Sequence, residues 1–159
     1  MLYKTTMIMI VLLHISDIIL VMNNKYQTLN HAKFKIRYHI IFSTKYRKKC
    51  LKPIIEDIKS YMKLAKSKQN EWEIEVMEID AIKPDHIHIM IKATPKCKVE
   101  DIVHSLKQTS TFYAWKNHHD YLSGFYWSGK HYLWTRGYFC TSIGDVSSST
   151  LKEYIEKQG

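Results

Sequence analysis

Two histidines separated by one residue, His86 and His88, are the side chains in this sequence best suited to hold a metal ion. They alternate with apolar residues in the run DHIHIMI (85–91), and on a β-strand residues two apart share a face at a spacing of roughly 6.6 Å. Two imidazoles placed in this way can converge on one ion. A pair of ordinary hydrogen-bonded histidines fits the spacing equally well. Because Met90 is a soft thioether unsuited to a hard ion, a bound metal would need a further ligand from elsewhere in the chain.

A second pair of polar residues lies near the end of the chain. Tyr154 and Gln158 are four residues apart, so a helix places them on one face, beside an apolar strip formed by Leu151 and Ile155. Taken alone, this pattern is typical of an amphipathic surface helix in which the tyrosine packs and the glutamine faces water.

The segments around these two pairs alternate between strand and helix patterns. Alternation of apolar and polar residues predicts the strands, and apolar residues at helical spacing predict the helices, the first of which has Pro53 in its opening turn. The expected elements are, in order, a strand over 34–42, a helix from about 53, strands over 73–80 and 86–92, a helix over 98–116, a strand over 138–143, and a last helix from 147 or 148 to the end.

The order β-α-β-β-α-β-α predicts an α+β fold of the split βαβ type, which is the ferredoxin-like or RRM-like arrangement. It has a four-stranded antiparallel sheet with helices on one face, leaves the other face free for ligands, and here adds a C-terminal helix. RNA-binding modules and small enzymes share this arrangement, so the fold alone does not decide the function.

Composition favours a nucleic-acid partner. The chain has 24 Lys and Arg against 15 Asp and Glu, a net charge of +9, together with 11 Tyr and 4 Trp. The positive charge and a hydrophobic content of 45% exclude an acidic disordered chain and a collagenous or Cys-rich scaffold. The three cysteines are far apart with no C-x-x-C spacing, which indicates reduced thiols in a cytoplasmic protein rather than a disulfide or zinc scaffold.

Residues 1–21 form an apolar extension that differs from the domain predicted over 22–159. Its apolar run is interrupted by His14 and Asp17, and it is too short for a membrane-spanning helix. No small-residue cleavage site follows it. We therefore expect Met22 to be the functional start and no membrane association, with a membrane or export role as the alternative.

Taken together, the segments resemble the HUH single-tyrosine transposases of small insertion sequences, the insertion sequence 200/605 type with TnpA-like proteins. The resemblance covers roughly residues 35–159. It rests on RYHIIF (37–42) with KYR (45–47), on DHIH (85–88), on Trp134 with YF (138–139) and SIG (142–144), and on YIEKQ (154–158). The chain departs from the pattern at Gln108, where relatives often carry glycine, and at Lys157, where asparagine is more usual.

The resemblance implies a metal-dependent DNA transposase that cleaves and rejoins single-stranded DNA through a 5′-phosphotyrosine. Carried over to this sequence, Tyr154 is the nucleophile, and His86, His88 and Gln158 bind a divalent metal, Mg²⁺ or Mn²⁺. Relatives recognise subterminal hairpins of their element. They work as homodimers in which the tyrosine helix of one subunit serves the histidines of the other, in trans.

Basic and aromatic residues near the motifs are candidate DNA contacts. Tyr46 is a candidate platform for unpaired bases, whereas Trp134 and Tyr138 are explained more readily by packing. A charge run can equally be a solvated face. The candidate phosphate contacts are Lys45, Arg47, Lys48, Lys49 and Lys107.

Three other functions remain open. The chain could be a domesticated or inactive relative that binds hairpin DNA or RNA, or an RNA-binding module that needs neither the metal pair nor Tyr154. The His-x-His pattern also resembles the histidine-triad nucleotide hydrolases, but those need a further histidine at the position of Met90 and a phosphate loop that is absent here.

Overall fold

The structure is a computed structural model that describes residues 27–29, 31–65, 71–80, 82–127 and 129–143. The predicted extension over 1–21 and the predicted last helix, with Tyr154 and Gln158, lie outside these ranges. Among the residues described, no helix is long and apolar enough to cross a membrane.

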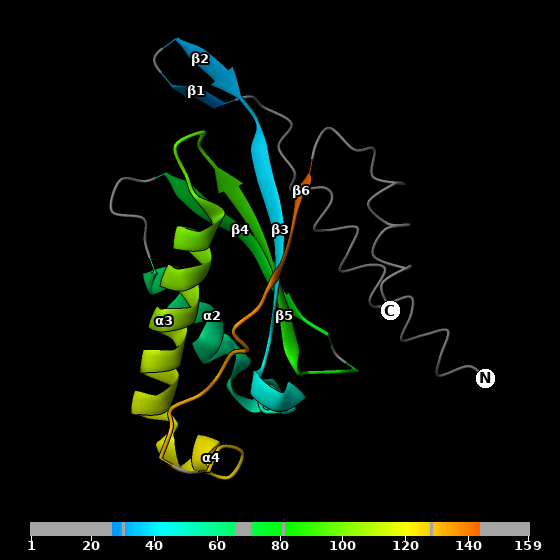
Figure 1. Ribbon diagram of the computed structural model, residues 1–159, viewed down its shortest axis with the longest axis vertical. Coiled ribbons are helices and arrows are strands. Elements are labelled where there is room, and N and C mark those ends of the chain that lie inside the picture. Colours follow the sequence, from blue (N-terminus) through cyan, green and yellow to red (C-terminus); the bar gives the residue numbers. More distant parts are fainter. Residues whose placement is uncertain (1–26, 30, 66–70, 81, 128, 144–159) are drawn as a thin grey trace, which may run out of the picture. The chain divides into compact units, whose positions relative to one another are not determined.

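Four antiparallel strands form the central sheet, in the spatial order β4-β5-β3-β6 (Figure 1). Some strands that are adjacent in the sheet are distant in the sequence, since one helix precedes β4 and another precedes β6. This arrangement confirms the predicted α+β fold with a four-stranded antiparallel sheet. The elements are β3 (Ile36–Ser43), α2 (Ile55–Leu64), β4 (Trp72–Ile79), β5 (His86–Ala93), α3 (Val99–Asn117) and β6 (Phe139–Ile143).

Helices α2 and α3 lie side by side on one face of the sheet and bury its apolar side chains (Figure 1). Strands β3 and β5 are at the centre, and every second residue of each faces the helices. Burying a side chain of this size contributes about 1.5–3 kcal/mol, so the alternation in the sequence fixes which face of each strand turns inward. The fully buried core residues include Ile40, Phe42, Ile58, Ile87, Ile89, Ile91, Ile102 and Leu106.

The opposite face of the two central strands carries the polar side chains. In the antiparallel register Ser43 pairs with His86, Ile41 with His88, and His39 with Met90. This register brings His39, at the middle of β3, onto the same face as the two motif histidines of β5. The open face predicted from the sequence is therefore the one that carries the histidines.

Several short elements were not predicted from the sequence. A strand pair, β1 (Gln27–Leu29) and β2 (Ala32–Phe34), forms a separate two-stranded sheet, so β3 begins at Ile36 rather than at residue 34. A five-residue helix, α4 (His119–Ser123), lies in the stretch predicted as a loop. Elements of three to five residues are too short to show periodicity. For the same reason the 3-10 turns η1 (Lys45–Arg47) and η2 (Lys52–Ile54) were not predicted individually.

Candidate active site

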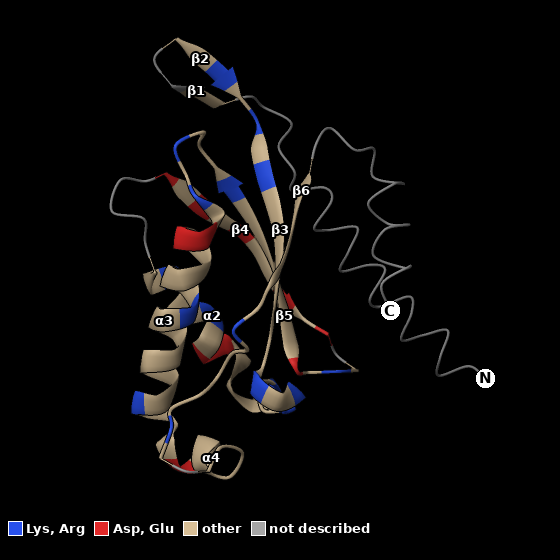
Figure 2. Ribbon diagram, in the orientation of Figure 1, with Lys and Arg blue, Asp and Glu red and all other residues tan. Residues whose placement is uncertain are grey.

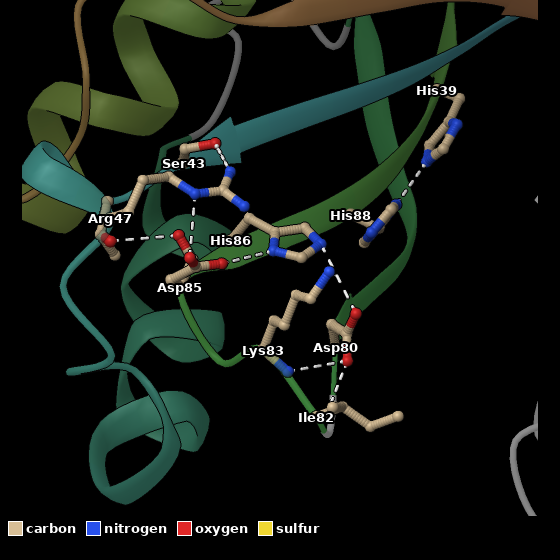
Figure 3. Close-up of polar contacts among 10 residues, drawn as sticks. His39, Ser43, Arg47, Asp80, Ile82, Lys83, Asp85, His86 and His88 are labelled. Carbon is tan, nitrogen blue, oxygen red and sulfur yellow. Dashed lines mark hydrogen bonds and ion pairs between the residues drawn. The ribbon is translucent and has the colours of Figure 1, made fainter. Parts of the chain in front are cut away.

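The two motif histidines project from the open face of β5, at the end where β5 begins (Figure 3). Their ring centroids are 5.0 Å apart. The shared face predicted from their spacing is therefore present, and the two imidazoles are close enough to face one bound ion.

His86 is held by a carboxylate from the residue before it. Its Nδ1 lies 2.7 Å from Oδ1 of Asp85, whose side chain is buried, with only 5% of the residue exposed. The other carboxylate oxygen, Oδ2, lies 2.9 Å from Nε of Arg47. Arg47 also donates from Nη1 to Oγ of Ser43 at 2.9 Å. One chain of polar contacts thus runs from the basic turn η1 through Asp85 to His86 (Figure 3).

His88 is held by a third histidine from the neighbouring strand. Nδ1 of His88 lies 3.0 Å from Nε2 of His39, and the two rings are stacked at a centroid distance of 5.2 Å. Burial lowers the pKa of His39, which is 6% exposed. Burial, together with the positive charge that His39 and His86 can carry, lowers the pKa of His88 to about 4. Both rings are therefore neutral near pH 7, and a neutral imidazole is the form that binds metal.

The hydrogen bonds of both motif histidines engage Nδ1, which leaves their Nε2 atoms for a ligand. Nε2 of His86 also lies 4.0 Å from Oδ2 of Asp80. Imidazole nitrogens are ligands that suit a transition-metal ion such as Mn²⁺. Within the described ranges, no group of three His, Cys, Asp or Glu residues is arranged to hold a metal. The predicted ligand Gln158 lies outside these ranges.

Asp80 closes the turn between β4 and β5 beside the histidines. Its Oδ1 accepts hydrogen bonds from the backbone N–H groups of Ile82 and Lys83, at 2.7 and 3.0 Å. Burial acts to raise the pKa of this carboxyl, but the two hydrogen bonds and the adjacent histidines lower it overall. Asp80 is therefore ionised near pH 7 and adds negative charge next to His86.

The basic turn η1 lies beside this site, because the backbone N–H of Thr44 donates to the carbonyl of Asp85 at 2.8 Å. Figure 2 shows its Lys and Arg residues close to the acidic residues at the end of β4 and the start of β5. Tyr46 is 66% exposed, and Nζ of Lys45 lies 5.0 Å from its ring centroid. Lys48 is half-buried and Lys49 is exposed. The candidate DNA contacts of this turn therefore have side chains that reach solvent, including Arg47, whose side chain is 57% exposed although it contacts Asp85.

Tyr46 and Arg47 both have left-handed backbone conformations, with φ of 60° and 55°. Such conformations are unfavourable for residues other than glycine, and they persist where the surroundings hold them in place. Here the Arg47 side chain is fixed by Asp85 and Ser43.

Lys107, the remaining candidate phosphate contact, is engaged within the protein. Its ammonium donates to the carbonyls of Thr135, Arg136 and Gly137 at 3.0, 3.2 and 2.7 Å. It also lies 5.0 Å from the ring centroid of Phe42. Burial lowers the pKa of Lys107 to about 8. Lys107 thus links α3 to the segment that precedes β6 through hydrogen bonds.

An open groove of about 750 Å³ runs between α3 and residues 131–138. Its lining includes Lys116 and Arg136, and the exposed rings of Phe112 and Tyr138. Trp134 also lines it but is buried, with its indole N–H donating to Oγ of Ser110 at 2.9 Å. Trp134 therefore packs, as expected, whereas Tyr138 presents part of its ring to solvent.

Sequence reasoning missed two side chains of this site. In the sequence, His39 is recognisable only as a polar residue that alternates with apolar residues of a strand. The register of β3 and β5, which brings His39 to His88, cannot be read from the sequence. Asp85 was part of the motif without a role. A carboxylate directly before a motif histidine is a signal that could have predicted the contact with His86.

Comparison with known proteins gives one consistent family. The family model described as "Transposase IS200 like" matches residues 32–158, a span that includes positions 154 and 158. The ISDra2 transposase TnpA of Deinococcus radiodurans is 29% identical over 136 residues, covering 79% of this chain and 85% of the relative. The transposase for insertion sequence element IS200 of Salmonella typhimurium is 26% identical over 133 residues, covering 83% and 82%.

Solved structures agree in fold. A crystal structure of a Deinococcus radiodurans R1 protein assigned as a transposase has a TM-score of 0.62 and 26% identity, covering 83% of this chain and 97% of that one. A REP-associated tyrosine transposase, solved bound to a REP hairpin, has a TM-score of 0.51 and 12% identity, covering 82% and 67%. The latter likeness concerns the fold alone. On the match of the family model across most of its length, this chain belongs to the family of IS200-like transposases.

Proposed function

We propose that this chain is an active DNA transposase that cleaves and rejoins single-stranded DNA at the ends of its insertion sequence. The observation that carries the proposal is the pair His86 and His88, whose rings lie on the open face of the sheet with centroids 5.0 Å apart and whose Nδ1 atoms are both engaged. Family membership supports the transposase activity. The cleavage and rejoining of single DNA strands, the binding of a metal and the identity of the nucleophile are parts of the proposal.

His86, His88 and Gln158 are proposed to hold a divalent metal, Mg²⁺ or Mn²⁺. The first two present imidazoles, which Mn²⁺ accepts more readily than Mg²⁺. The amide oxygen of Gln158 is the proposed third ligand. A divalent ion bound there supplies charge stabilisation at the scissile phosphate.

Tyr154 is the proposed nucleophile. Because the phenol of tyrosine ordinarily has a pKa near 10, the group must lose its proton as Oη attacks the phosphorus. The bond from phosphorus to the 3′ oxygen breaks, that oxygen takes a proton, and the products are a 5′-phosphotyrosine and a free 3′-hydroxyl. One phosphodiester replaces another. Attack by a 3′-hydroxyl on the phosphotyrosine therefore rejoins a strand without ATP.

The proposed partner is single-stranded DNA with subterminal hairpins. The exposed side chains of Tyr46 and Lys49, with Lys45 against the tyrosine ring, offer stacking and charge next to the histidines. The groove between α3 and residues 131–138 combines cations with exposed rings and suits an unpaired strand. A homodimer in which the Tyr154 helix acts in trans is part of the proposal, as is a cytoplasmic location.

Trapping of the covalent intermediate tests the proposal. Full-length protein is incubated with Mn²⁺ and a labelled oligonucleotide that carries the imperfect palindrome from the DNA flanking its gene. We expect a protein–DNA adduct that survives denaturation. Tyr154→Phe should abolish the adduct while retaining DNA binding, whereas the control Tyr113→Phe, which removes a hydroxyl from α3, should not.

Two outcomes would contradict the proposal. An undiminished adduct in Tyr154→Phe would show that another residue is the nucleophile. Cleavage that persists in excess chelator, or in His86→Ala, would show that no metal is needed at this pair. Hairpin binding that stays metal-independent and never yields an adduct would instead indicate an inactive, DNA-binding relative.

A further inference from the structure

The carboxylate of Asp85 joins two different groups, one on each oxygen. Oδ1 lies 2.7 Å from Nδ1 of His86, and Oδ2 lies 2.9 Å from Nε of Arg47. Asp85 is 5% exposed, so these two contacts satisfy a charge that is almost removed from water. A carboxylate held from both sides cannot rotate without losing one of its partners.

Arg47 is itself fixed in place. Its Nη1 donates to Oγ of Ser43 at 2.9 Å, and Ser43 lies directly opposite His86 in the register of β3 and β5. The backbone of the turn is tied to the same point, because N–H of Thr44 donates to the carbonyl of Asp85 at 2.8 Å. The Arg47 side chain stays 57% exposed, and its backbone has a left-handed φ of 55°.

A carboxylate on Nδ1 determines where His86 carries its proton. Nδ1 must bear the hydrogen to donate to Asp85, so the lone pair of the neutral ring is on Nε2. The contact also stops the ring from turning about its bond to Cβ, and it increases the electron density at Nε2. Each of these effects prepares Nε2 to bind a cation.

We propose that Asp85, held by Arg47, is a positioning residue that fixes His86 as the Nδ1–H tautomer with Nε2 directed toward the metal. The proposal rests on the proposed function in that it takes His86 to be a metal ligand. It gives the basic turn η1 a second role, because Arg47, otherwise a candidate phosphate contact, acts on the metal site through Asp85. The contact between Asp85 and Arg47 forms within the protein, so this role does not require bound DNA.

The first test measures the tautomer directly, without DNA and without metal. Two-dimensional NMR of protein labelled with ¹⁵N in histidine, in the presence of chelator at neutral pH, reports which ring nitrogen of His86 carries the hydrogen. We expect Nδ1–H in the wild type. Asp85→Ala should shift His86 toward the Nε2–H form, and Asp85→Asn, which keeps an acceptor oxygen, should shift it less.

The second test measures Mn²⁺ affinity by the electron paramagnetic resonance signal of the free ion. Asp85→Ala should weaken binding about 10- to 100-fold, the range found when a partner of a metal-binding histidine is removed. Arg47→Ala should weaken it less and Arg47→Lys less again. The matched control is Asp57→Ala on α2, which removes a carboxylate 3.0 Å from His118 and should change neither His86 nor Mn²⁺ affinity.

The results separate this proposal from the proposed function. An unchanged His86 tautomer together with unchanged Mn²⁺ affinity in Asp85→Ala would overturn the positioning role alone, provided that the wild type binds Mn²⁺. A wild type that does not bind Mn²⁺ would overturn the proposed function and this proposal with it. Should Asp85→Ala fail to fold, Asp85→Asn and the exposed Arg47→Ala carry the same test, and wild-type behaviour of both would refute the proposal.

Discussion

Nε2 of His39 lies 3.0 Å from Nδ1 of His88, and the two imidazole rings are stacked across neighbouring strands. If His88 is to offer Nε2 to a metal, its Nδ1 carries the hydrogen and His39 accepts it. The motif histidines are therefore supported unequally. His86 has a charged carboxylate on its Nδ1, whereas His88 has a buried, neutral ring.

Substitution of His39 should weaken metal binding through His88. We expect His39→Leu, which removes the acceptor, to lower Mn²⁺ affinity about 10-fold, and His39→Gln, whose amide oxygen can accept from Nδ1, to lower it less. Equilibrium titration with Mn²⁺ measures the effect. His119→Leu, at an exposed position of α4, is the control, and equal affinities for the two His39 variants would argue against the acceptor role.

Acid should destabilise the metal-free protein through the same pair. The pKa of His88 is lowered from 6.5 to about 4 by burial and by its neighbouring histidines. Between these values the unfolded chain binds a proton that the folded chain does not, so the free energy of unfolding falls as the pH drops from 6.5 toward 4. Above pH 6.5 His88 is neutral in both states and has no effect.

Urea denaturation in chelator at a series of pH values measures this dependence. His88→Gln, which cannot take the proton, should show a shallower loss of stability across the same window. Carboxylates add the same slope to both proteins, so only the difference between them is diagnostic. Identical slopes would mean that His88 titrates normally in the folded protein.

Loss of the Lys107 ammonium should destabilise the fold. Lys107→Met leaves the carbonyls of residues 135–137 without their donor, and we expect a loss of about 1–2 kcal/mol in the free energy of unfolding, because water can replace part of the interaction. Lys63→Met, at an exposed position of α2, should change it by less than about 0.5 kcal/mol. If the free energy of unfolding were unchanged while DNA binding became less dependent on salt, the main role of Lys107 would be contact with DNA phosphate rather than stabilisation of the fold.

The exposed ring of Tyr46 should contribute to binding of unpaired DNA. Tyr46→Ala should weaken affinity for a single-stranded oligonucleotide by about 1–3 kcal/mol per stacked base, and Tyr46→Phe should retain most of it, because stacking needs the ring and not the hydroxyl. Fluorescence anisotropy measures the affinity, and thermal unfolding checks that the fold is intact. Wild-type affinity in Tyr46→Ala would assign the ring to packing against Lys45.

The sheet and its two large helices were predictable from the sequence because their periodicity is set by burial. The isoleucines of β5 and the apolar residues of α3 occur at the spacings that their buried faces require. The pairing of β3 with β5 was not predictable, since register depends on contacts between distant segments. His39 therefore joined the site only in three dimensions, whereas His86 and His88 were visible from their own spacing. The roles of Tyr154 and Gln158 stay predictions.

The contact of Asp85 with His86 and that of His39 with His88 depend on folding in different ways. Asp85 is the residue next to His86 and accompanies it in any arrangement of the strands, but His39 meets His88 only when β3 and β5 are paired in one alignment. A slip of one residue would turn His39 toward the helices and away from His88. The same slip would turn Ile40 and Phe42 of β3 away from the core. The contact between His39 and His88 thus forms only with the correct alignment of the central strands, so under the proposed function a chain mispaired at these strands would be inactive as well as unstable.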